Sequence, residues 1–236
     1  MKYINRSSSL KALLLACAAL AVSVGVQAQQ AEPEDVNAPY RDPNLDVEVW
    51  VDRFESEGRE AYDFREQIVE GIGLRPGQSV ADVGAGTGLF EPLLAARVGG
   101  SGKVYAVDIV PSFIEHIEEK AAERGLTQVE AVLGAEDSIR LPADSVDVVF
   151  VCDAYHHFED YEAMLESIHT ALRPGGKLVI VEFDRVEGES PEFVLEHIRA
   201  SKEEFTDEIE ANGFRLTDDA TVDGMSETFV RHFEKR

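Results

Sequence analysis

A glycine-rich segment led by an acid is the part of this sequence that points most directly to chemistry. Asp82-Val83-Gly84-Ala85-Gly86-Thr87-Gly88 follows a short apolar run and precedes a helix-like stretch. Glycines at such a turn permit positive φ and let a ligand approach the backbone, because no Cβ stands in the way. We therefore expect the segment to join a strand to a helix at the carboxyl edge of a sheet, where open α/β sheets bind ligands.

The spacing of these glycines argues against two common nucleotide loops. A dinucleotide loop has the pattern G-x-G-x-x-G and a phosphate loop G-x-x-x-x-G-K-[ST], whereas this loop reads G-x-G-x-G and no lysine follows it. A carboxylate at the mouth of the loop disfavours a pyrophosphate and favours a cation, such as an amino-acid head group or a sulfonium. An NAD-dependent dehydrogenase stays open as an alternative, since Asp108 would suit NAD, although no Tyr is followed four residues later by Lys.

Further acids follow the next two predicted strands. Asp108 ends the run Val104-Tyr105-Ala106-Val107-Asp108, where a carboxylate can accept both hydroxyls of a ribose. Alternatively, Asp108 caps the helix that follows. Glu136 or Asp137, just past the third predicted strand, could accept the exocyclic amine of an adenine, or the two belong to a simple acidic loop.

A histidine pair follows the fourth predicted strand, in Asp153-Ala154-Tyr155-His156-His157-Phe158. One histidine there could act as a general base near neutral pH, and His156 is the stronger candidate. The alternative is that both histidines cap or pack against the next helix. Cys152 is expected to be a buried strand residue rather than a nucleophile. With two thiols in the whole chain, no metal site is predicted.

Strand and helix patterns alternate around these residues. An apolar stripe from Val47 to Gly73 predicts a helical cap before the first strand. Two strand-like runs near the end of the chain have no room for a helix between them, so they must pair antiparallel. The pattern predicts an α/β fold: a doubly wound, mostly parallel sheet of seven strands with an antiparallel C-terminal hairpin. The predicted strands are 79–83, 103–107, 129–133, 146–152, 177–183, 214–220 and 227–233, and the helices between them are 89–98, 111–124, 161–172 and 202–211.

The first 28 residues differ in composition from the rest. Lys2, Arg6 and Lys11 give a positive start, the run from Leu10 to Val26 is mostly apolar, and Val26-Gln27-Ala28 resembles a signal-peptidase site. We therefore expect a signal peptide, 1–28, that is cleaved near Ala28 and directs export to the bacterial periplasm, leaving no stable membrane insertion. An uncleaved anchor and a lipoprotein are the alternatives. Residues 29–46 are then an extended lead-in and 47–236 a single domain.

The charge of the chain excludes some partners. It carries 22 Lys+Arg against 46 Asp+Glu, a formal net charge of −24. Nucleic-acid binding needs clustered cations that displace counterions from phosphates, and adhesion to anionic membranes needs cations as well. Neither partner is expected.

Taken in order, these motifs resemble the class I S-adenosylmethionine-dependent methyltransferases, in particular their small-molecule, type 11-like branch. VADVGAGTG (80–88) is similar to the first family motif, VYAVDI (104–109) to the second acidic strand end, and LRPGGKLVIVEF (172–183) to the turn and fifth strand. The resemblance implies a Rossmann-like fold, S-adenosyl-L-methionine as cofactor, and a small-molecule methyl acceptor. Because Asp153 is not followed by the prolines of N/D-P-P-Y-like motifs, O- or C-methylation is favoured over N-methylation of bases or glutamine.

The resemblance also implies residue roles. Asp82 and the glycines would hold the methionine portion, Asp108 the ribose, and Ile109 would pack on adenine. The implied cofactor-binding set is Asp82, Gly84, Ala85, Gly86, Gly88, Asp108, Ile109, Glu136, Asp137 and Asp153. A non-catalytic alternative stays open, because S-adenosylmethionine is made inside cells and nothing in the sequence explains how an exported protein meets it. In that case the domain would be a scaffold or a binder of the cofactor or its demethylated product.

Overall fold

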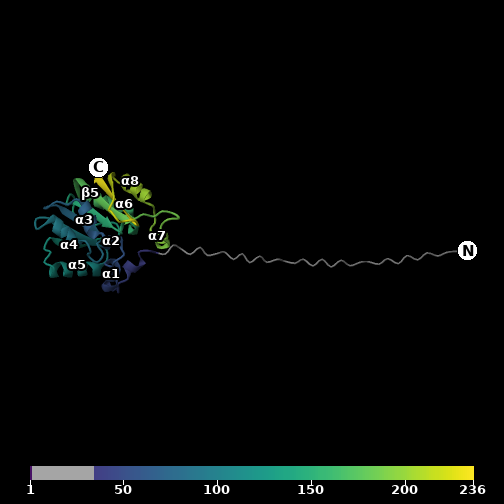
Figure 1. Ribbon diagram of the computed structural model, residues 1–236, viewed down its shortest axis with the longest axis horizontal. Coiled ribbons are helices and arrows are strands. Elements are labelled where there is room, and N and C mark those ends of the chain that lie inside the picture. Colours follow the sequence, from purple (N-terminus) through teal and green to yellow (C-terminus); the bar gives the residue numbers. More distant parts are fainter. Residues whose placement is uncertain (2–34) are drawn as a thin grey trace. The chain divides into compact units, whose positions relative to one another are not determined.

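The computed structural model describes Met1 and residues 35–236 (Figure 1). The predicted signal peptide therefore lies outside the described residues, apart from Met1, and so does the start of the predicted lead-in. Among the described residues, no helix combines the length and the apolar character needed to cross a membrane.

Seven strands form one sheet, in the order β3-β2-β1-β4-β5-β7-β6. Neighbouring strands from β3 to β5 pair in parallel, whereas β7 runs antiparallel to both β5 and β6. This confirms the predicted Rossmann-like, mostly parallel sheet with an antiparallel C-terminal hairpin. The strands are β1 Ser79–Val83, β2 Lys103–Asp108, β3 Val129–Leu133, β4 Val146–Cys152, β5 Leu172–Phe183, β6 Phe214–Ala220 and β7 Thr228–Lys235.

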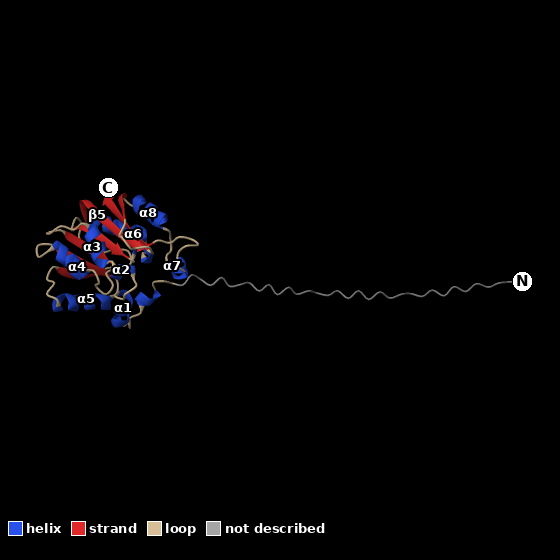
Figure 2. Ribbon diagram, in the orientation of Figure 1, coloured by secondary structure: helices blue, strands red, loops and turns tan. Residues whose placement is uncertain are grey.

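Helices cover both faces of the sheet (Figure 2). α3 and α4 pack on one face, α6, α7 and α8 on the other, and α5 packs against β2. The helices are η1 Ala38–Arg41, α1 Val47–Phe54, α2 Glu60–Asp63, α3 Arg65–Ile72, α4 Glu91–Val98, α5 Pro111–Glu123, η2 Tyr155–His157, α6 Tyr161–Ala171, α7 Glu192–His197 and α8 Lys202–Ala211.

Alternate residues of the central strands are buried on opposite faces of the sheet. In β4, Val148 and Phe150 belong to the core with α3 and α4, whereas Val149 and Val151 belong to the core with α6 and α8. Burial on both faces explains why the sequence of β4 is an almost continuous apolar run. Cys152 ends this strand as a buried free thiol, as predicted.

Three parts of the chain differ in detail from the sequence prediction. Residues 47–73 form three helices rather than one continuous helix. The first break falls in the turn after α1, where Gly58 adopts φ +94°. The strand predicted at 177–183 already begins at Leu172. The segment between β5 and α8 contains α7, which is too short to show a helical period.

One side chain joins the helical cap to the sheet. The Glu60 carboxylate, at the start of α2, accepts hydrogen bonds from the backbone N–H groups of Ser226, Glu227 and Thr228 and from the Thr228 hydroxyl. These donors lie at the start of β7. These hydrogen bonds hold the start of α2 against the start of β7.

Candidate functional site

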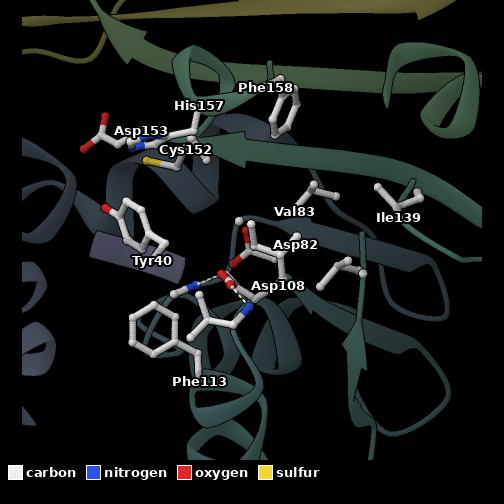
Figure 3. A pocket seen from close by; sticks show the side chains of 18 of the residues that line it. Tyr40, Asp82, Val83, Asp108, Phe113, Ile139, Cys152, Asp153, His157 and Phe158 are labelled. Atoms are coloured by element: carbon white, nitrogen blue, oxygen red, sulfur yellow. Dashed lines mark hydrogen bonds between the residues drawn. The ribbon is translucent and has the colours of Figure 1, made fainter. Parts of the chain in front are cut away.

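A cleft lies at the carboxyl ends of β1, β2 and β4. Its empty volume is about 1110 Å³, the open mouth included. Strand order reverses direction between β2-β1 and β4, which is the point where open α/β sheets bind ligands. Figure 3 shows Asp82 and Asp108 next to each other, with Tyr40 and Phe113 on one side of them and Val83 and Ile139 on the other.

The cleft brings together most of the residues that the sequence singled out. The lining includes Asp82, Gly84, Ala85, Gly86, Asp108, Ile109, Glu136, Asp153 and His157. Three of the predicted site residues do not line it: Gly88, Asp137 and His156. Gly88 instead faces a small separate hollow beside α4 and α5. Asp137 is exposed in a turn that backbone hydrogen bonds between Ala135 and Ser138 close.

The glycine loop forms a surface that side chains would obstruct. Gly84 has φ +78°, and a Cβ on it would lie 2.4 Å from the Cβ of Ala154. Gly86 has φ +56°, and a Cβ there would lie 3.2 Å from the Phe54 ring. The backbone N–H groups of Gly84 and Ala85 both donate to the carbonyl of Val107, which holds the loop against β2. The missing side chains let Ala154 and Phe54 pack against the loop, and the loop backbone lines the cleft.

A buried pair of acids lies beneath this loop. Asp82 is 1% exposed and Glu91 is 3% exposed. Among the described residues, no N–H or hydroxyl group donates to Asp82 Oδ2 or to either Glu91 carboxylate oxygen, and the two carboxyl groups hydrogen-bond to each other. Burial, followed by the charge of Glu91, raises the pKa of Asp82 well above its usual value, and burial raises the pKa of Glu91 to about 7. The site thus holds acceptors that a cationic ligand would satisfy.

Asp108 lines the cleft and does not cap α5, whose N-cap residue is Val110 with no side-chain cap. Its Oδ2 accepts from the Gly86 N–H at 2.8 Å and its Oδ1 from the Val110 N–H at 2.9 Å, just before α5. Each carboxylate oxygen has a second lone pair, so the side chain can also accept from hydroxyl groups of a ligand. Burial raises the pKa of Asp108 to about 6. Ile109, beside it, is 40% exposed.

Asp153 places a second acceptor in the cleft, at the end of β4. Its backbone has φ 47°, an uncommon conformation for a non-glycine residue. Its Oδ2 lies 2.8 Å from an Arg59 guanidinium nitrogen, and its Oδ1 is buried without a partner among the described residues. Burial raises the pKa of Asp153 to about 6, although the charge of Arg59 acts in the opposite direction.

The two histidines of η2 have different surroundings. His157 lines the cleft, whereas His156 is 4% exposed and its Nδ1 lies 2.8 Å from Glu182 Oε2. The choice of His156 as the base is therefore not supported by its position, because its ring is turned to Glu182 rather than to the cleft. Burial lowers the pKa of His156 to about 4, and burial together with the charge of His156 lowers that of His157 to about 2.

The described part of the predicted lead-in, η1 and its flanks, contributes lining that the sequence analysis missed. Tyr40 stacks on Trp50 with ring centroids 4.7 Å apart and meets the His157 ring edge-on at 5.1 Å. Arg41 pairs with Glu136 at 3.2 Å and also with Glu159. Residues 35–46 have no apolar period, so no signal in the sequence placed them over the cleft.

Comparison with known proteins shows which family the residues of this cleft resemble. Residues 81–180 match the family described as "Methyltransferase domain". That segment contains the glycine loop, Asp108, Asp153 and His157, which is most of the cleft. Over these residues the chain is similar to a methyltransferase domain. S-adenosylmethionine is the cofactor of such a domain, as the resemblance implied.

Relatives of the chain include enzymes that act on quinones. The chain is 30% identical over 119 residues to a demethylmenaquinone methyltransferase of Geobacillus sp., covering 50% of this chain and 51% of that protein. It is 29% identical over 127 residues to the ubiquinone/menaquinone biosynthesis C-methyltransferase UbiE of Shewanella oneidensis, covering 53% of this chain and 51% of that one. The chain thus spans about half the length of the curated relatives it matches.

A solved structure extends the similarity to the whole fold. A SAM-dependent methyltransferase from Aquifex aeolicus matches with a TM-score of 0.71 and 26% identity, over 81% of this chain and 99% of that chain. The structural similarity therefore extends beyond residues 81–180.

The cleft fits the cofactor of the methyltransferase family. The buried Asp82 carboxylate suits a cationic amino-acid portion, and the backbone of the glycine loop lines the same cleft. Asp108 keeps lone pairs for ribose hydroxyls, and Ile109 offers an exposed apolar surface for a base. When bound, S-adenosylmethionine supplies an electrophilic methyl group. Asp82, Asp108 and Ile109 would bind this cofactor and orient it in the cleft.

Proposed function

We propose that this protein transfers a methyl group from S-adenosylmethionine to a small organic acceptor. The observation that carries the proposal is the buried Asp82, which lines the cleft and has the Glu91 carboxyl, but no cation, as a side-chain partner among the described residues, beside a glycine loop with no room for side chains. A buried carboxylate with no cationic partner costs folding free energy unless a ligand satisfies it. A ligand that carries an ammonium and a sulfonium does so.

The acceptor that fits best is a phenol- or quinol-like ring, methylated at carbon or oxygen. The relatives that share the central segment are named for quinone methylation. The cleft offers the aromatic side chains of Tyr40, Phe54, Phe113 and Phe158, which provide stacking surface for a flat ring as well as for adenine. The absence of prolines after Asp153 disfavours planar amide or amine nitrogen as the acceptor.

Asp153 is the residue best placed to receive the acceptor's proton. Asp153 belongs to the cleft lining, its Oδ1 has no hydrogen-bond partner among the described residues, and a pKa of about 6 leaves the carboxyl mostly ionised at neutral pH yet basic enough to hold a proton. Arg59 holds the other oxygen and so fixes the carboxylate. Removing a proton from a ring hydroxyl makes the ring oxygen and the adjacent carbon nucleophilic. The cleft then needs to hold the attacking atom, either the ring oxygen or the adjacent carbon, in line with the methyl carbon and the sulfur.

Two measurements on the purified protein test the proposal. Calorimetry should show binding of S-adenosylmethionine and of its demethylated product, and labelled cofactor should pass its methyl group to reduced quinones or simple phenols. Binding without transfer to any acceptor would favour the non-catalytic alternative. No binding heat from a folded sample would contradict both.

We also propose that residues 1–28 direct export, on the basis of the cationic start, the apolar run and the small-x-small pattern before Gln29. Amino-terminal sequencing of the protein recovered from a periplasmic fraction should begin near Gln29. Recovery of an intact amino terminus from the cytoplasm would overturn this proposal and would remove the question of how the protein obtains its cofactor.

A further inference from the structure

Three imidazole rings gather beside the cleft. His156 and His157 come from η2, and His197 comes from the last residue of α7, forty positions further along the chain. One ring nitrogen of each histidine lies within 4.8 Å of the others. The ring centroids of His156 and His157 are 4.0 Å apart, and those of His156 and His197 are 5.0 Å apart.

The buried histidine of this cluster is oriented by a carboxylate. Glu182, which is fully buried in β5, accepts from the His156 backbone N–H and lies 2.8 Å from His156 Nδ1. His156 Nε2 is buried and has no hydrogen-bond partner among the described residues. A carboxylate on one ring nitrogen with the other nitrogen left available is the arrangement that orients histidine ligands of metal ions.

A second histidine of the cluster has an outer partner of its own. His157 Nδ1 lies 2.7 Å from Asn37 Oδ1, and the Asn37 amide also donates to the His157 carbonyl at 3.0 Å. An Nδ1–H donated to an amide oxygen leaves the Nε2 lone pair of His157 for a ligand. Glu182 thus orients the His156 ring through its Nδ1, and Asn37 orients the His157 ring through its Nδ1.

We propose that His156, His157 and His197 bind a divalent transition-metal ion of the zinc type. Imidazole nitrogens are preferred ligands of Zn²⁺, with bonds of about 2.0–2.1 Å and tetrahedral geometry. That geometry places ligand nitrogens about 3.4 Å apart, so the rings need to close in by rotations of their side chains. The nearby carboxylates of Glu182 and Asp153 favour a cation, and Arg53, Arg59 and Arg199 are nearby cationic side chains that oppose it.

The proposed ion would lie at the edge of the cofactor cleft, because His157 belongs to both. Three nitrogen ligands leave the fourth tetrahedral position open, as in zinc sites that bind an oxygen ligand. The two cysteines predict no metal site, and His197 lies far from the histidine pair in sequence, so the cluster has no sequence signal. Metal binding is measured without methyl transfer, so it stands or fails independently of the proposed function.

The experiment is a metal titration of the protein after treatment with a chelator and removal of any affinity tag. Calorimetry with Zn²⁺ should show one ion per chain, and Co²⁺ should give the visible absorption of a nitrogen-ligated tetrahedral site. His197→Ala and His157→Gln should each weaken binding more than about 100-fold, the upper range for loss of an outer partner. Glu182→Gln, which removes only an orienting group, should weaken binding about 10–100-fold.

His116→Ala is the matched control, because it removes a histidine of α5 that lies outside the cluster. It should bind Zn²⁺ like the unmodified protein. Circular dichroism of each metal-free variant checks that it is folded, and His157→Gln replaces His197→Ala if the latter unfolds. Failure of the unmodified protein to bind Zn²⁺ or Co²⁺ at one equivalent, or equal binding by folded His197→Ala and His157→Gln variants, would overturn the proposal.

Discussion

At the scale of the residue, this protein is marked by carboxyl groups buried where their charge is costly. Asp82, Glu91, Asp108, Asp153 and Glu182 are all buried or nearly so, and burial raises the pKa of each. Removing such groups from water disfavours their ionised form. Asp82, Asp108 and Asp153 line one cleft, which indicates that a ligand there, rather than the fold, benefits from them.

Asp82→Asn is expected to weaken binding of S-adenosylmethionine by about 1.5–3 kcal/mol, because a hydrogen bond to a charged group is replaced by one to a neutral amide. Calorimetry measures the change in affinity. Asp207→Asn, an exposed acid of α8, is the matched control and should bind normally. An Asp82→Asn protein that binds as tightly as the control would show that Asp82 does not contact the cofactor.

Glu91→Gln is expected to stabilise the ligand-free protein at pH 8 but not at pH 5. The pKa of Glu91 is raised to about 7 by burial, so the folded state favours the protonated form, and its contribution to stability is lost as the pH rises through 7. Urea unfolding should show a gain of about 1–3 kcal/mol at pH 8. The exposed Glu118→Gln of α5 is the control; the same gain at both pH values would refute the assignment to ionisation.

Asp153→Asn tests the proposed base. Turnover should fall about 100-fold or more, the usual contribution of general base catalysis, while the affinity for S-adenosylmethionine changes little. Rates with a labelled cofactor and an accepted quinol, together with calorimetry, separate the two effects. A normal rate would assign Asp153 to holding Arg59 rather than to chemistry.

At the scale of the element, the cap helices are attached to the sheet through a few side chains. Glu60 of α2 accepts hydrogen bonds from Glu227 N at 3.1 Å and from Thr228 N at 3.0 Å, and Arg59 pairs with Asp153. Both residues stand where α2 begins. The cap therefore contacts the C-terminal hairpin through Glu60 and the cleft through Arg59.

Glu60→Ala is expected to destabilise the fold by about 1–3 kcal/mol, because several backbone donors lose a charged acceptor. Burial opposes ionisation of Glu60, but the hydrogen bonds from Ser226, Thr228 and Glu227 outweigh it and lower the pKa. Its contribution is thus present above its unfolded pKa and lost as the pH falls below it. Thermal unfolding at pH 7 and pH 3.5 should show the difference narrowing in acid, whereas Glu70→Ala, exposed on α3, should show little change at either pH.

At the scale of the whole molecule, a net charge of −24 adds to the cost of ionising the buried acids. Ligand binding and proton binding should consequently be linked. A cationic ligand in the cleft lowers the pKa values of nearby carboxyl groups, so that groups protonated in the free protein become ionised in the complex.

Binding of S-adenosylmethionine at pH 6.5 should therefore release protons. Asp82, whose pKa is raised well above its usual value, Asp108, at about 6, and Glu91, at about 7, are at least partly protonated there in the free protein. Affinity should rise with pH between about 6 and 7.5, below the ordinary pKa of an α-amino group. Calorimetry in two buffers of different ionisation enthalpy measures the released protons. The demethylated product, which lacks the sulfonium charge, should release fewer; heats that do not depend on the buffer would contradict the linkage.

The sequence by itself determined the order in which strands and most helices follow one another along the chain, and the position of the glycine loop between the first strand and the next helix. Asp82, Gly84 and Gly86 were identifiable because their roles depend on neighbours within a few residues: a strand before, a turn between and a helix after. The C-terminal hairpin was predictable for the same local reason, since six residues between two strands leave no room for a crossover.

Only the tertiary structure decided which side chains meet across the cleft. The packing of η1 brings Tyr40 to the His157 ring, α7 brings His197 to His156, and α4 places Glu91 beside Asp82. Sequence patterns cannot predict such contacts, because packing between elements brings together residues far apart in the chain. The same limit explains the choice between His156 and His157: they are adjacent in one short turn, and the contacts of each ring with Glu182 or Asn37 decide which one faces the cleft.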